Sequence, residues 1–146
     1  MSSIMIIRNN LRKRPLWMNV LMLFCAYMAV IYVPWDFLLK PVAEDEEVWF
    51  GILLTGWWAK ATEPLHLAIY AAGAWGFWYR RPWMHPWAAL YTGQVALGML
   101  VWSLIDVRGP GLVGGLVAAL PFLVLAIFLW RARTHFQAAT SIQEDV

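Results

Sequence analysis

The sequence predicts an all-α integral membrane protein, namely a four-helix bundle with an additional interfacial or re-entrant segment on the outer side. Hydrophobic residues make up 62% of the 146 residues and charged residues 14%, against about 45–50% and 25% in soluble domains. Several long stretches carry no charge, and a helix of about 20 such residues crosses a hydrocarbon core of about 30 Å. At this length we expect one membrane domain, residues 1–146.

The first two predicted spans cover residues 16–33 and 62–79. The first contains no charged residue, and Pro34 is expected to end it because proline cannot donate a helical hydrogen bond. The second begins at Thr62, a residue suited to cap a helix, with Pro64 in the first turn. We therefore expect a long connection between these two spans on the outer side.

The last two predicted spans cover residues 86–105 and 109–130. Asp106 closes the third span, and a tight glycine- and proline-rich turn precedes the fourth. Pro121 lies inside the fourth span, where a proline predicts a kink. The two spans are therefore expected to form a short-looped helical pair.

Within the long connection, residues 48–59 are apolar and rich in tryptophan. Twelve residues cover only about 18 Å as a helix, too little to cross the membrane. Three forms are open: a helix lying in the interface, a re-entrant turn, or an extension of the second span bent at Pro64. We expect this segment to remain on the outer side.

The basic residues are unevenly distributed if the four spans alternate in direction. Eight fall on the side of the termini (Arg8, Arg12, Lys13, Arg14, Arg80, Arg81, Arg131 and Arg133), and three fall on the other (Lys40, Lys60 and Arg108). Cytoplasmic loops carry the excess of Lys and Arg. The sequence therefore predicts a plasma- or inner-membrane protein with both termini in the cytoplasm.

Three acids lie at outer ends of the predicted spans: Asp36, Glu63 and Asp106. Ionisable groups at the edge of the hydrocarbon are costly and mark functional sites, so we expect Asp36 and Glu63 to face a shared cavity. The alternative is that these acids face water and that Glu63 favours a helix amino terminus.

His66 follows Glu63 by three residues, so the two share a helix face. An acid and an imidazole in contact can relay a proton, and Asp36, Glu63 and His66 are therefore the candidate catalytic residues. The alternative role for His66 is a hydrogen bond between helices. The sequence shows no metal-ligand spacing, no cofactor motif and no nucleic-acid motif, so neither a metal nor a cofactor is expected.

Other side chains are suited to bind a lipophilic ligand. Trp57 and Trp58 belong to a cluster of outer-side tryptophans, which can form an aromatic pocket. Gln94, near the middle of the third span, is a buried amide that needs a hydrogen-bond partner. Its alternative role is to join two helices.

This pattern resembles the EXPERA group of membrane proteins, which includes emopamil-binding sterol isomerases and sigma-2 receptor-like proteins. Tyr32 and Asp36 occupy the place of that family's first-helix His and Glu, so Tyr32 departs from the family. Glu63 resembles its second-helix Glu. Gln94 after Gly93, with Asp106 twelve residues later, resembles its Gly-Gln segment followed by an acid. The resemblance implies four helices around a lipophilic cavity, with Tyr32, Gln94 and Asp106 among its ligand-binding residues.

The sequence therefore predicts a small, tryptophan-rich membrane protein that binds an isoprenoid- or sterol-like lipid. If it is an enzyme, it is expected to be an isomerase-like catalyst of proton transfer. The alternative is an accessory subunit of a larger membrane protein complex, because small polytopic chains without catalytic motifs fit that role.

Overall fold

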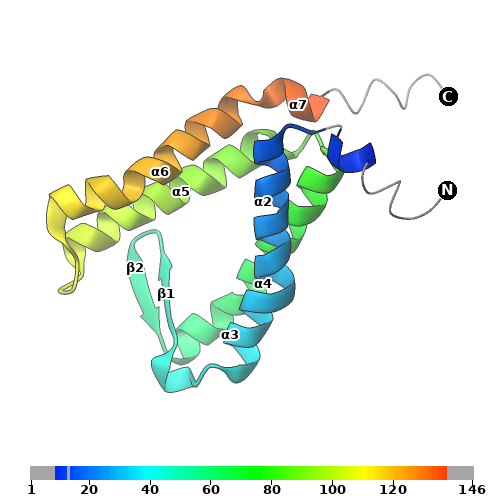
Figure 1. Cartoon of the computed structure of the whole chain (residues 1–146). Coiled ribbons are helices and arrows are strands. Elements are labelled where there is room, and N and C mark those ends of the chain that lie inside the picture. Colours follow the sequence, from blue (N-terminus) through cyan, green and yellow to red (C-terminus); the bar gives the residue numbers. More distant parts are fainter. Residues whose placement is uncertain (1–8, 13, 138–146) are drawn as a thin grey trace.

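Figure 1 shows the computed structural model, which describes residues 9–12 and 14–137 and is mostly helical. Among the described residues, three helical segments are long and apolar enough to cross a membrane: Leu16–Leu39, Met84–Ile105 and Gly111–Arg131. A fourth long helix, α4 (Trp57–Tyr79), carries more polar residues and is not among them. The prediction of a helical membrane protein is therefore confirmed in this coarser form.

The first span is longer than predicted. Helix α2 (Leu16–Tyr27) continues through a π-helical turn (Met28–Tyr32) into α3 (Val33–Leu39). The prediction that Pro34 ends this helix is wrong, because Pro34 lies in the first turn of α3. The wide π-helical turn directly before it allows the helix to continue past Pro34, although proline cannot donate a helical hydrogen bond. Asp36, which lies after the end of the predicted span, is therefore part of a helix.

The segment after α3 contains a β-hairpin, which the all-α prediction did not include. A short 3-10 turn (Val42–Glu44) precedes β1 (Glu46–Trp49), which pairs antiparallel with β2 (Ile52–Thr55). Phe50 and Gly51 form the two-residue turn, and both have positive φ, which suits the right-handed twist of a hairpin. The sheet corrects our prediction of an interfacial helix or re-entrant turn at residues 48–59.

The remaining residues of that segment, 57–59, begin α4, so they extend the helix predicted at residues 62–79 toward the hairpin. Helix α4 begins five residues before Thr62 and runs through Pro64. Thr62 is therefore not an amino-terminal cap, and its hydroxyl donates instead to the Ala59 carbonyl at 2.7 Å. Helices α5 (Met84–Ile105) and α6 (Gly111–Arg131) follow, and α6 continues through Pro121 into the short α7 (Arg133–Gln137).

The long helices form two antiparallel pairs instead of the predicted four-helix bundle, which the structure does not confirm. Helix α2 packs along α4, and α5 packs along α6, whereas α4 and α5 have little contact with each other. In Figure 1 the pairs converge where α2 begins and α4 ends, and they diverge toward the hairpin. The hairpin contacts both α4 and α5, so it occupies the space between the diverging ends.

The buried core lies at the convergent end of the two pairs. Met18, Phe77, Met84 and Phe136 belong to one buried cluster there. The buried Arg14 side chain donates from its Nη1 to the carbonyl oxygens of Phe77 and Trp78, at 3.1 and 2.6 Å. A cation at these last carbonyls stabilises the carboxyl end of α4. At this end of the molecule, the buried cluster holds the helices together, and Arg14 caps the carboxyl end of α4.

We expect Gly51→Ala to lower the thermal unfolding temperature markedly. Gly51 has a φ of +87°, which an L side chain rarely adopts. A Cβ atom there would also overlap the Val101 side chain on α5, so the hairpin would have to move away from the helix. Gly93→Ala is the matched control, because nothing lies within 4 Å of its added Cβ. Equal unfolding temperatures for the two variants would contradict this packing of the hairpin on α5.

Candidate functional site

Four carboxylates gather where α3, the hairpin and α4 meet. They belong to Asp36 on α3, Asp45 before the hairpin, Glu47 on β1 and Glu63 on α4, and one oxygen of each lies within 4.8 Å of the others. Asp36 and Glu63 are each only 1% exposed. The structure therefore brings together two of the three acids that the sequence placed at one membrane level, together with two acids that it did not single out. We call these four residues the acid cluster.

Two lysines neutralise one half of the acid cluster. Lys40 Nζ lies 3.1 Å from Asp36 Oδ1 and 2.9 Å from Asp45 Oδ1. Lys60 Nζ lies 3.2 Å from Asp45 Oδ2 and donates to the backbone carbonyl of Asp36. These contacts join the end of the first span to α4 through the fully buried Asp45.

Asp45 and Lys40 stabilise each other's charged form. Burial disfavours the charged form of Asp45, but its hydrogen bonds to Lys40 and Lys60 outweigh burial and hold its pKa below the usual range. Burial likewise opposes the charge of Lys40, but its hydrogen bonds to Asp45 and Asp36 raise its pKa above the usual range. Both groups are therefore charged at neutral pH, and they bind each other as ions.

The other half of the acid cluster faces a histidine. His66 Nδ1 lies 3.6 Å from Glu47 Oε2, and a ligand atom of Glu63 lies within 4.8 Å of both residues. The Trp49 ring stacks on the imidazole, with centroids 4.5 Å apart and planes at 14°. His66 thus has a fixed ring orientation beside two glutamates, which is an arrangement suited to proton transfer.

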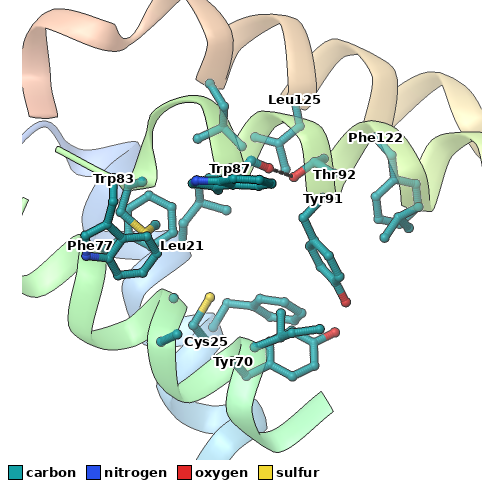
Figure 2. Close-up of a pocket in the computed structure, with 18 residues that line it drawn as sticks. Leu21, Cys25, Tyr70, Phe77, Trp83, Trp87, Tyr91, Thr92, Phe122 and Leu125 are labelled. Atoms are coloured by element: carbon teal, nitrogen blue, oxygen red, sulfur yellow. Dashed lines mark hydrogen bonds between the residues drawn. The ribbon is translucent and has the colours of Figure 1, made fainter. Parts of the chain in front are cut away.

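A cavity of about 350 Å³ lies between the two helix pairs, toward their convergent end (Figure 2). Its lining is almost entirely apolar and comes from all four long helices: Leu21, Phe24, Cys25, Ile69, Tyr70, Ala72, Gly73, Phe77, Trp83, Met84, Trp87, Ala88, Tyr91, Thr92, Val95, Phe122, Leu125 and Leu129. The Thr92 hydroxyl is already engaged, because it donates to the Ala88 carbonyl at 2.8 Å. A volume of this size and composition is typical of small-molecule sites.

Two polar groups of the cavity lining are the hydroxyls of Tyr70 and Tyr91. Figure 2 shows both hydroxyls at the same side of the cavity. The Tyr70 ring lies 6.3 Å from that of His66, centroid to centroid. His66 therefore stands between the acid cluster and a residue that lines the cavity, so the two features are neighbours on α4.

The remaining predicted site residues are more dispersed. Tyr32 lies one helical turn before Asp36, with its ring 6.3 Å from that of Trp35. Trp57 and Trp58 are 76% and 77% exposed and do not line the cavity. Their large exposure fits anchoring at the membrane interface.

Gln94 and Asp106 on the α5 side also lie outside both features. Gln94 is half-buried on α5 and is not among the cavity-lining residues, although Tyr91 and Val95 are. Asp106 Oδ1 accepts from the Arg108 backbone N–H at 2.8 Å, and Arg108 Nη1 lies 3.0 Å from Glu46 Oε2. Asp106 thus orients Arg108 toward β1 and is not a member of the acid cluster.

Sequence reasoning missed Asp45, Glu47, Lys40 and Lys60 as members of this site. For Asp45 and Glu47 the signal was present in the run from Glu44 to Trp49, which precedes a Phe-Gly turn and a second apolar run. Two β-prone runs separated by two residues with glycine indicate a hairpin. A hairpin folds this run back onto α4, which brings Glu47 beside Glu63.

Comparison with protein-family models, with curated proteins and with solved structures finds no match to this chain.

Proposed function

We propose that this protein binds a lipophilic molecule of isoprenoid or sterol character in the cavity between its two helix pairs. The observation that carries the proposal is the cavity itself, about 350 Å³ with an apolar and aromatic lining drawn from four helices. Such a lining favours a ligand with a rigid or branched hydrocarbon body. The hydroxyls of Tyr70 and Tyr91, which interact with each other, also give the cavity a polar position at which a ligand with one polar group could bind.

The acid cluster lies outside the cavity lining, but it supports a proton-transfer role next to the cavity. Asp36 and Glu63 supply buried carboxylates, and His66 lies between them and Tyr70 on the cavity wall. If the protein is an enzyme, an isomerase-like shift of a double bond catalysed by proton transfer is the chemistry these residues support. The sequence pattern that resembles the EXPERA group points to the same ligand class.

The proposed setting is a plasma or inner membrane with both termini in the cytoplasm. The excess of basic residues on the terminal side supports this orientation. The cavity then lies toward the cytoplasmic half of the membrane, and the acid cluster lies toward the outer face. The alternative, an accessory subunit of a membrane complex, would place a protein partner against the apolar helix faces.

Photo-crosslinking tests the location of the ligand. The purified full-length protein in mild detergent would be irradiated with a photoreactive cholesterol analogue and, separately, with a photoreactive farnesyl analogue. We expect at least one probe to label α4 and α5 peptides at cavity-lining residues such as Tyr70 and Tyr91. Excess unlabelled compound should compete with that labelling. Labelling spread evenly over exposed residues of α6, with no competition, would contradict the proposal.

A further inference from the structure

Glu47, Glu63 and His66 form a compact donor set at the outer end of α4. Their ligand atoms all lie within 4.8 Å of one another. The separation of His66 Nδ1 and Glu47 Oε2 is 3.6 Å. Two ligands bound tetrahedrally to zinc at 2.0–2.1 Å lie about 3.4 Å apart. Small side-chain rotations would therefore bring the three donors around one ion.

In the described part of the chain, this donor set has no lysine or arginine as an ion-pair partner, and only its own His66 faces Glu47. Within residues 9–12 and 14–137, Lys40 and Lys60 pair with Asp36 and Asp45, and no lysine or arginine forms an ion pair with Glu47 or Glu63. Two adjacent carboxylates removed from water require a proton or a cation between them. Both the negative charge of the two glutamates and the spacing of the three donor atoms therefore suit a bound cation.

A buried oxygen of Glu63 supplies independent support. Glu63 is 99% buried, and its Oε1 has no hydrogen-bond partner. Burial of an unpartnered carboxylate oxygen is costly, and the carboxylate is directed toward Glu47 and His66. A bound ion at this position would satisfy it.

We propose that Glu47, Glu63 and His66 bind one divalent transition-metal ion of the zinc class. One imidazole and two carboxylates suit such an ion better than Mg²⁺ or Ca²⁺, which prefer oxygen ligands alone. The side chains of Glu47 and His66 remain 20% and 15% exposed, which leaves an entry path and a position for water. The ion replaces the proton that the two glutamates would otherwise share.

Neighbouring residues hold the His66 ring in an orientation suited to coordinate a metal ion. Trp49 stacks on the ring and fixes its orientation, and β1 holds both Trp49 and Glu47. Glu63 and His66 are separated by one turn of α4, so their donors face the same side. This inference does not rest on the proposed lipid ligand, because none of the three residues lines the cavity.

Metal titration of the purified full-length protein tests the inference. The protein would be freed of its affinity tag, stripped with a chelator and titrated in mild detergent with Zn²⁺ by calorimetry. Titration with Co²⁺ would report coordination by its absorption spectrum. We expect one equivalent of each ion to bind, and Zn²⁺ to displace Co²⁺. Failure of both ions to bind saturably to the folded wild type would overturn the inference without any variant.

Variants locate the site. We expect Glu47→Gln, Glu63→Gln and His66→Ala each to weaken Zn²⁺ binding at least tenfold and to change the Co²⁺ spectrum. The matched controls are Glu44→Gln, an exposed acid outside the donor set, and His135→Ala near the carboxyl end, which should both keep wild-type affinity. Circular dichroism and gel filtration establish that each variant is folded. Unchanged affinity in the folded donor-set variants would overturn the assignment of these residues.

Discussion

Replacing Asp45 by Asn is expected to lower the free energy of unfolding by about 3–5 kcal/mol, the usual cost of breaking a buried ion pair. Asp45 is fully buried and is the residue that Lys40 and Lys60 share. Asn has nearly the same size, so the substitution removes charge and leaves packing almost unchanged. The buried Lys60 ammonium would then lose its carboxylate partner, and the connection between α3 and α4 would loosen.

The measurement is unfolding in mild-detergent micelles titrated with a denaturing detergent, with wild type and variant compared under identical conditions. Glu44→Gln is the control, since Glu44 is exposed beside Asp45, and exposed substitutions usually change stability by within about 0.5 kcal/mol. A loss below 1 kcal/mol for Asp45→Asn would show that the ion pairs do not hold α3 and α4 together.

The same residue predicts a dependence of stability on pH. Because the pKa of Asp45 is lower in the folded protein than its usual value of about 3.9, its contribution to stability is fully present above that value. The contribution is lost as the pH falls through the lower, folded-state pKa. Wild type should therefore lose stability more steeply than Asp45→Asn below about pH 4. Parallel curves for the two proteins would contradict this linkage.

Filling the cavity is expected to abolish ligand retention. Ala88 lines the cavity at the start of α5, and Ala88→Phe places a ring where the hydrocarbon body of the ligand would lie. We expect the amount of lipophilic compound that copurifies to fall at least tenfold, which corresponds to about 1.4 kcal/mol or more of binding free energy. Tyr70→Phe, which keeps the volume but removes a hydroxyl, should cause a smaller loss of a ligand with one polar group.

Ala71→Phe provides the control for the cavity-filling variant. Ala71 is exposed on α4 and is not among the lining residues, so an added ring there should face the lipid. Equal retention by Ala88→Phe and Ala71→Phe would show that the ligand does not occupy this cavity. The unfolding temperatures of both variants would separate an effect on binding from an effect on folding.

Three of the four predicted spans correspond to helices long and apolar enough to cross a membrane, because their signal is local, whereas the span predicted at residues 62–79 lies in α4, which is not among them. Long runs without charge determine three of the four long helices, whatever their neighbours are. The sequence could not predict how the helices pair. Apolar faces can pack in several arrangements, and hydropathy does not distinguish the observed pairing of α2 with α4 and of α5 with α6, with the hairpin in contact with α4 and α5.

The site was predictable only in part, for the same reason. Asp36 and Glu63 could be placed together because both were assigned to outer ends of adjacent spans. Glu47 reaches them through the register of a two-stranded sheet, and register is not visible in a hydropathy pattern. The prediction that Pro34 ends a helix was wrong for a different reason. A π-helical turn precedes this proline, and the helix continues through it.

The most direct test of the central claim is mass spectrometry of the organic extract from the wild-type protein purified in mild detergent. We predict one lipophilic species of isoprenoid or sterol character at close to one molecule per chain, enriched over its abundance in the host membrane and depleted in Ala88→Phe. An extract with only bulk membrane lipids in their host proportions would contradict the claim. A stable stoichiometric protein partner in place of a lipid would instead establish the accessory-subunit alternative.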